Sequence, residues 1–152
     1  MRTFTSADDI TGAVGETIGT SDWLEITQER VNTFADATGD HQWIHVDVER
    51  ATKESPFGGP IAHGYLTLSL LPMLSWQTYT VENSRMGVNY GSNKVRYVHP
   101  VPVGSRIRLV AVLGAADSLA DGAVQMTVDS TIEIEGVDKP ALVAQVISRV
   151  YF

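Results

Sequence analysis

The sequence predicts an α+β fold in which a curved antiparallel β-sheet wraps around one central apolar helix. The first half of the chain contains helix-forming patterns and loops. After residue 85, apolar residues alternate at a period of two, which is typical of strands with one buried face. The chain has 152 residues and no internal repeat or linker-like stretch, so we expect a single domain over residues 1–152.

Two short helices are expected before the apolar one. Thr27 is a suitable N-cap, apolar residues then recur at helical spacing, and Gly39 provides a stop. Residues 40–45 should therefore lie on a turn. A second helix is expected over residues 47–53, and the glycines and prolines of residues 55–60 predict a loop after it.

The apolar helix is expected from about residue 62 to 78. Its leucines, together with Met73 and Trp76, point in nearly every direction, so protein should enclose it on all sides. Pro72 removes one backbone hydrogen bond and should kink the helix. The apolar run over residues 64–76 is well short of the roughly 20 residues needed to span a bilayer.

Strand-like alternation then occupies most of the second half of the chain. Asp121-Gly122 is a turn signal between two of the strands. Short turns between consecutive strands imply antiparallel pairing, and the apolar helix is the one segment long enough to cover a face of the resulting sheet. The alternating stretches are residues 86–90, 107–113, 124–134 and 142–152.

Composition narrows the classes of partner. The formal net charge of −7 argues against nucleic acid and anionic membranes. The absence of cysteine excludes disulfides, thiolate metal sites and cysteine nucleophiles. Residues 1–16 contain no apolar core that would act as a signal peptide, so we expect a cytoplasmic protein. Four basic residues lie close together in sequence and are either solvated strand residues or a site for a phosphorylated ligand: Lys94, Arg96, Arg106 and Arg108.

Asp40 and His45 are the candidate catalytic residues. Both follow Gly39 on the expected turn, and catalytic groups concentrate on loops held by a rigid scaffold. A carboxylate and an imidazole that share one water can accept and donate protons near neutral pH. Spacing alone leaves two alternatives open: a structural Asp–His pair, or a zinc site that also uses His41, although Gly39 breaks the helix that would align its ligands.

Residues 59–65 lead into the apolar helix and include a second candidate site. Backbone N–H groups near Gly64 would be free donors of a helix N-terminus. Such donors can stabilise a carbonyl oxygen as it becomes an enolate. The alternative is an ordinary glycine near a helix start. His63 is expected to be a cap or a supporting residue rather than a third catalytic group.

Residues 34–51 resemble the signature of the hydratase-2 family, which comprises the MaoC-like dehydratases and R-specific enoyl-CoA hydratases. The chain differs from the family at Gln42 and Trp43, where Asn-Pro is usual. Residues 60–64 and 97–104 are similar to later segments of the family, and the resemblance extends from about residue 15 to the end. The matching signature residues are Phe34, Thr38, Gly39, Asp40, Ile44, His45 and Ala51.

The resemblance implies the hot-dog fold, a homodimer, and an acyl-CoA site near the subunit interface. It also implies reversible addition of water to a trans-2-enoyl-CoA, giving a (3R)-hydroxyacyl-CoA, in fatty-acid metabolism. Asp40 and His45 would activate the water, and the N–H of Gly64 would bind the thioester oxygen. Gln42, Lys94 and Arg96 are candidate contacts to the substrate or to CoA.

No metal or cofactor is expected, because the thioester itself accepts the electrons of the double bond. Two other functions remain open at this stage. One is thioester hydrolysis, since hot-dog proteins include thioesterases. The other is a non-catalytic module that binds acyl-CoA or an acyl carrier.

Overall fold

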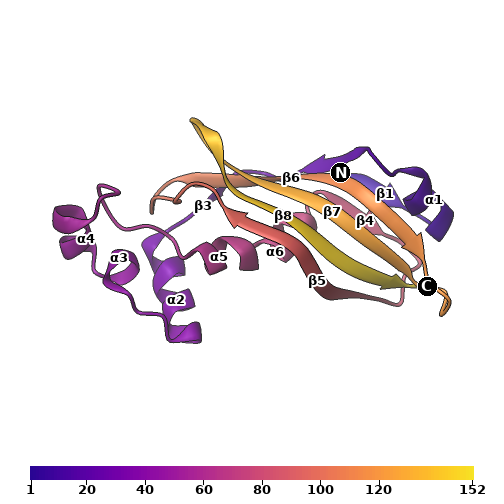
Figure 1. Ribbon diagram of the computed structural model, residues 1–152, viewed down its shortest axis with the longest axis horizontal. Coiled ribbons are helices and arrows are strands. Elements are labelled where there is room, and N and C mark those ends of the chain that lie inside the picture. Colours follow the sequence, from indigo (N-terminus) through magenta and orange to yellow (C-terminus); the bar gives the residue numbers. More distant parts are fainter.

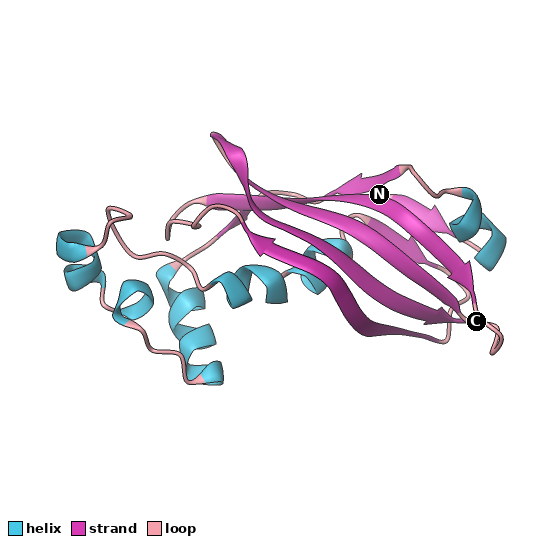
Figure 2. Ribbon diagram, viewed as in Figure 1, coloured by secondary structure: helices cyan, strands magenta, loops and turns pink.

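A computed structural model describes all residues from Met1 to Phe152. A curved six-stranded sheet forms one layer, and helices α5 (Gly64–Ser69) and α6 (Leu71–Ser75) lie against one of its faces (Figure 1). Helices α2 (Gln28–Thr38), α3 (Trp43–Val46) and α4 (Val48–Glu54) extend beyond one end of the sheet (Figure 2). The predicted α+β hot-dog layout is confirmed.

The strand order of the large sheet is β2-β6-β7-β8-β5, and β3 also pairs with β6. All of these pairings are antiparallel. The strands are β2 (Thr17–Thr20), β3 (Leu24–Glu25), β5 (Met86–Tyr97), β6 (Arg106–Ser118), β7 (Val124–Ile134) and β8 (Val137–Tyr151).

The expectation that consecutive strands pair throughout is wrong for β5, which pairs with β8 rather than with β6. The connection from β5 to β6 is a crossover held by the segment that precedes α5. In it, the Ala62 N–H donates to the Val101 carbonyl at 2.8 Å, and the Val103 N–H donates to the Pro60 carbonyl at 3.0 Å. These bonds hold the connecting segment in place as the chain passes from the edge strand β5 to β6.

Five short elements near the chain start and after α6 were not expected. They are β1 (Arg2–Phe4), α1 (Ala7–Gly12), β4 (Tyr79–Val81) and the strands β2 and β3 given above, and β1 pairs in parallel with β4. Segments of two to six residues are too short to show a periodic apolar pattern, so sequence reasoning missed them.

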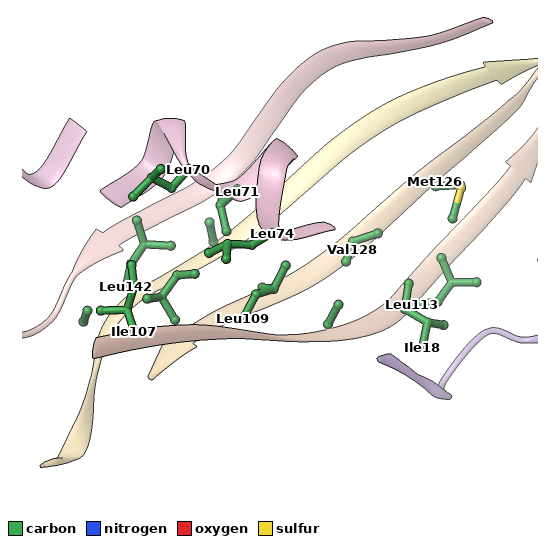
Figure 3. Close-up of a cluster of buried hydrophobic side chains, with 14 of the residues drawn as sticks. Ile18, Leu70, Leu71, Leu74, Ile107, Leu109, Leu113, Met126, Val128 and Leu142 are labelled. Carbon is green, nitrogen blue, oxygen red and sulfur yellow. The ribbon is translucent and has the colours of Figure 1, made fainter. Parts of the chain in front are cut away.

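The core lies between the sheet and the paired helices. Along β6 and β7 alternate residues are buried, as predicted from their period of two. Leu71 and Leu74 project from α6 toward the sheet, and Leu70, which lies between α5 and α6, belongs to the same buried cluster (Figure 3). Burial of this apolar face is the main favourable contribution to the stability of the fold.

β5 departs from this pattern. All of its residues except Val95 are exposed, so the expectation that Met86, Val88 and Tyr90 face the core is wrong. The physical reason is position, because β5 is the edge strand and an open cavity rather than packed protein lies beside it. Alternation predicts a strand but does not say whether another element covers it.

The helices before the sheet follow their end signals closely. The Thr27 side chain accepts a hydrogen bond from the Arg30 N–H, and Gly39 ends α2 in the left-handed region with φ 80°. The expected second helix is α4, and the Asp47 side chain caps it. The expected turn over residues 40–45 needs one correction, because His45 lies on the one-turn helix α3. Four residues are too few to show helical periodicity.

The apolar helix is two short helices with a break at Leu70, and Pro72 lies in the first turn of the second, so the predicted kink is confirmed. The expectation that protein encloses it completely is wrong. Trp76 is 76% exposed and Tyr65 is 69% exposed, because the sheet covers only one side of the helices. None of the helices combines the length and apolar character that crossing a bilayer requires.

Candidate active site

Asp40, His45 and Gly64 meet where the loop after α2 approaches the start of α5. One side-chain ligand atom from each of Asp40, His45 and His63 lies within 4.8 Å of the others. His45 and Gly64 line one cleft of about 280 Å³ together with Thr67 and Tyr97. The fold therefore brings the sequence-predicted catalytic pair and the sequence-predicted backbone donor to one place.

His45 is held in a defined tautomer. Its side chain is buried, and Nδ1 lies 2.7 Å from the Ile61 carbonyl oxygen. A carbonyl oxygen only accepts, so Nδ1 carries the proton and Nε2 keeps a free lone pair. Burial lowers the pKa of His45 below 6.5, and the charge of His63 lowers it further, against opposing effects of the Ile61 hydrogen bond and of Asp40. His45 is thus a neutral base at neutral pH.

The backbone around His45 is fixed from two directions. Gln28 on α2 donates from Nε2 to the His45 carbonyl at 2.7 Å. On the other side, the Ile61 N–H donates to the Ile44 carbonyl at 3.0 Å. Helix α3 is therefore tied both to α2 and to the segment that leads into α5.

Asp40 directly follows Gly39, whose left-handed conformation turns the chain out of α2. The carboxylate is exposed, and its one side-chain hydrogen bond comes from the Gln42 N–H at 3.4 Å, which is long for this type of bond. Asp40 therefore keeps most of its capacity to accept hydrogen bonds, as expected of a group that binds water or substrate.

Gly64 is the first residue of α5, so its N–H is among the four that a helix leaves without an internal partner. A Cβ atom at this position would lie 3.0 Å from Cδ1 and 3.1 Å from Cγ of the Tyr97 ring. Glycine therefore allows the close approach of Tyr97 without displacing its ring, and the same absence of a side chain leaves room in the cleft beside the N–H.

His63 is more central than the sequence indicated. It is only 2% exposed, and its Nε2–H donates to the backbone carbonyl of Asp40 at 2.9 Å. Its ring stacks on that of His45 with centroids 3.8 Å apart and an interplanar angle of 28°. The side chain makes no helix-capping hydrogen bond, so of the two expected roles, a cap or a supporting residue, the cap is excluded. Its place directly before Gly64 was the available sequence signal.

The alternative zinc set of Asp40, His41 and His45 does not come together. His41 is exposed, and its Nε2 lies 2.9 Å from the Asp36 carboxylate. This hydrogen bond is the largest cause of a raised pKa at His41. The cluster instead contains His63, which sequence spacing did not place there.

The three candidate contacts to substrate or CoA are all exposed. Gln42 precedes α3 and makes no side-chain capping bond. Lys94 and Arg96 lie on β5, the strand that ends at Tyr97 in the cleft.

The four basic residues do not form one phosphate site. Arg106 and Arg108 lie on β6, which β7 and β8 separate from β5, and form ion pairs with Glu135 and Glu133 respectively. The idea of a single basic group is therefore wrong. Proximity in sequence cannot show that the chain crosses the sheet between residues 96 and 106.

A larger cavity of about 820 Å³ has lining residues different from those of the cleft. It is lined by one side of α5 and α6, including Leu68, Pro72 and Trp76, and by β5, β7 and β8. Leu68 directly follows Thr67 of the cleft, so the two spaces border consecutive residues of α5.

The chain is similar to known proteins in family pattern, in overall sequence and in structure. The family model described as MaoC like domain matches residues 9–134. The 3-hydroxyacyl-thioester dehydratase Z of Mycobacterium tuberculosis is 58% identical over 149 residues, covering 98% of each chain. Among solved structures, a monoamine oxidase regulatory protein from Archaeoglobus fulgidus matches with a TM-score of 0.79 at 25% identity, over 98% of this chain and 95% of that one.

The R-hydratase PhaJ1 from Pseudomonas aeruginosa shares the fold, with a TM-score of 0.71 at 19% identity over 91% of this chain and 81% of that one. The family match over residues 9–134 and the 58% identity to the mycobacterial dehydratase each show the family. The chain therefore belongs to the MaoC-like dehydratase family and is a hydratase/dehydratase of that family, a hydro-lyase.

Proposed function

We propose that the protein reversibly adds water to the C2=C3 bond of a trans-2-enoyl-CoA to give a (3R)-hydroxyacyl-CoA, in fatty-acid metabolism. The observation that carries this proposal is the free Nε2 of a buried, neutral His45 beside the exposed Asp40 carboxylate, with the Gly64 N–H in the same cleft. The name of the mycobacterial relative, a 3-hydroxyacyl-thioester dehydratase, supports a thioester substrate.

The proposed reaction uses these groups in sequence. Asp40 and His45 hold one water, and the pair takes one of its protons as the oxygen bonds to C3. The electrons of the double bond move onto the thioester oxygen, where the Gly64 N–H stabilises the negative charge. The pair then returns one proton to C2, so that protons balance over the cycle. The low pKa of His45 keeps Nε2 available as a base at neutral pH.

The proposed reaction uses no metal or redox cofactor, because the conjugated thioester accepts the electron pair. The cluster of Asp40, His45 and His63 makes this part of the proposal worth testing, since the same atom types bind metals. Activity should survive prolonged treatment with a chelator. Loss of activity that returns on adding a divalent metal would overturn the cofactor-free mechanism.

We further propose that the acyl chain extends from the cleft into the cavity of about 820 Å³. Support comes from the shared helix α5, because Thr67 lines the cleft and Leu68 lines the cavity. On the CoA side, Gln42, Lys94 and Arg96 are the proposed polar contacts. The two cations are favourable for phosphate binding on an otherwise acidic chain.

The proposed working unit is a homodimer. β5 pairs on one side only, and its exposed residues include Val88 and Tyr90, beside the exposed Trp76 of the α6 end. A long unpaired strand edge with apolar side chains is avoided in monomers. Antiparallel pairing of β5 with a second copy would satisfy two-fold symmetry. Light scattering should give twice the chain mass, and Val88→Lys should shift it toward the monomer. A wild-type monomer at micromolar concentration would contradict this proposal.

One assay distinguishes the proposed reaction from its two rivals. A short enoyl-CoA is incubated with the protein, and the conjugated absorbance and free thiol are both followed. Hydration removes the absorbance without thiol, a thioesterase releases thiol, and a binding module does neither. Asp40→Asn and His45→Gln should each lower the hydration rate roughly a thousandfold or more. His41→Gln is the matched control and should stay near the wild-type rate. Wild-type rates in the first two variants would refute the site.

A further inference from the structure

His63 contacts both members of the catalytic pair without reaching substrate through a free polar atom. Its Nε2–H binds the Asp40 carbonyl at 2.9 Å, and its ring stacks on His45 with centroids 3.8 Å apart. Phe34 of α2 packs near the same ring, with centroids 5.1 Å apart. The remaining ring nitrogen, Nδ1, is buried and has no hydrogen-bond partner. An interior polar group left in this state is unusual and calls for a reason other than solvation.

We propose that His63 is a positioning residue for hydration. Its single imidazole fixes the position of the Asp40 loop relative to the His45 ring. This inference rests on the proposed function of Asp40 and His45. It differs from the supporting role expected from sequence, because it assigns two separate contacts to one side chain and a measurable kinetic consequence to each.

The Asp40 contact matters because little else holds that residue. The Asp40 side chain is exposed and receives only one long hydrogen bond, from Gln42 at 3.4 Å. Its backbone follows Gly39, and glycine gives the chain more conformational freedom than any other residue at that point. The bond from His63 therefore anchors the peptide unit from which the carboxylate projects. Misplacing a catalytic group by about 1 Å can cost about a hundredfold in rate.

The stacking contact with His45 restrains the orientation of the His45 ring. Nδ1 of His45 is bonded to the Ile61 carbonyl, which fixes one point of the ring but leaves it able to tilt about that bond. The stacked ring of His63 limits the tilt and so directs Nε2 of His45.

Two substitutions separate the contacts. His63→Gln keeps an N–H donor near the position of Nε2 but removes the ring, whereas His63→Phe keeps a ring for stacking but cannot donate to Asp40. We expect kcat to fall roughly 10- to 100-fold in His63→Phe, with KM within about twofold of wild type. His63→Gln should recover at least threefold of that loss. Circular dichroism and melting temperature check that both variants are folded, and His41→Gln serves as the matched His-to-Gln control.

The kinetic outcomes are decisive in either direction. If His63→Phe keeps kcat within about threefold of wild type, or if folded Gln and Phe variants are equally slow, the positioning role through Asp40 is wrong. A double variant adds a second test. Because His63 acts through Asp40, adding His63→Phe to Asp40→Asn should lower the residual rate less than threefold. A full multiplicative loss would overturn the inference.

A spectroscopic measurement keeps this inference separable from the proposed function. The carbonyl ¹³C shift of Asp40 reports the hydrogen bond that its oxygen accepts. It should move upfield in His63→Phe and stay near its wild-type value in His63→Gln. This result requires no turnover, so a wild-type protein that fails to hydrate enoyl-CoA would refute the proposed function while the shift still decides the His63 contact. Equal Asp40 shifts in the two variants would overturn the inference about His63.

Discussion

Replacing Gly64 by alanine tests the geometry of the proposed backbone donor with one methyl group. The new Cβ would meet Cδ1, Cγ and Cε1 of the Tyr97 ring at 3.0, 3.1 and 3.2 Å. Carbon atoms pack best at about 3.5 to 4.0 Å, so the ring and the start of α5 must separate by roughly half an ångström. Tyr97 is 47% exposed and can move toward solvent, so the fold should accommodate the change.

The expected effect is therefore large in rate and small in stability. Complete loss of an oxyanion donor costs about 100- to 1000-fold in kcat, and a displaced donor should forfeit part of this. We expect kcat for a short enoyl-CoA to fall about 10- to 100-fold in Gly64→Ala. The free energy of unfolding should change by only about 1 kcal/mol, since alanine is favoured over glycine in a helix by roughly 0.5–1 kcal/mol.

Loss of absorbance of the enoyl-CoA measures the rate, and urea unfolding measures the stability. The double variant Gly64→Ala with Tyr97→Ala removes the ring that the methyl group meets. Gly64→Ala is thus made in two backgrounds, wild type and Tyr97→Ala, and its fold-loss in kcat is measured in each. If displacement by Tyr97 causes the loss, the fold-loss should be smaller in the Tyr97→Ala background. A wild-type kcat in Gly64→Ala would refute the role of this N–H in the cleft.

Three further predictions address the base, the cavity and the scaffold. Burial lowers the pKa of His45 below 6.5, so kcat/KM should be constant through neutral pH and fall only on acidification below that value, as Nε2 is protonated; a decline that begins on acidification above pH 6.5 contradicts this. Ser75→Phe should narrow the 820 Å³ cavity and lower the hydration rate of a twelve-carbon enoyl-CoA at least about tenfold more than that of a four-carbon one. An equal decrease for both substrates would show that the acyl chain lies elsewhere. Ser21→Ala removes a buried hydroxyl that accepts from the Leu109 N–H at 2.9 Å, so urea unfolding should show a loss of about 1–2 kcal/mol with kcat per folded protein unchanged; an unchanged midpoint would contradict it.

Local signals in the sequence predicted a substantial part of the fold. Thr27 and Gly39 define the ends of α2 as expected, because capping depends on side-chain and backbone chemistry within a few residues. The apolar alternation of β6 and β7 is confirmed by their burial. Both signals depend only on residues close together in the sequence, so they predict an element without knowledge of the elements that pack against it.

Pairings between distant segments were beyond these signals. β5 shows the alternation of a half-buried strand but is an exposed edge, because the crossover between residues 97 and 106 places it next to β8. The same crossover separates Lys94 and Arg96 from the arginines of β6. The cavity beside α6 likewise arises from elements that the chain brings together over long separations.

For the site, the sequence by itself determined which groups are available: the Asp40 carboxylate, the His45 imidazole and a glycine at the start of the apolar helix. Tertiary structure alone decided their states. The Ile61 carbonyl selects the tautomer of His45, the Tyr97 ring lies against the α-carbon side of Gly64 where a methyl group would displace it, and His63 contacts both catalytic residues. Residue type sets which protons a group can exchange, but burial, the tautomer and mutual distance depend on contacts between segments far apart in the chain.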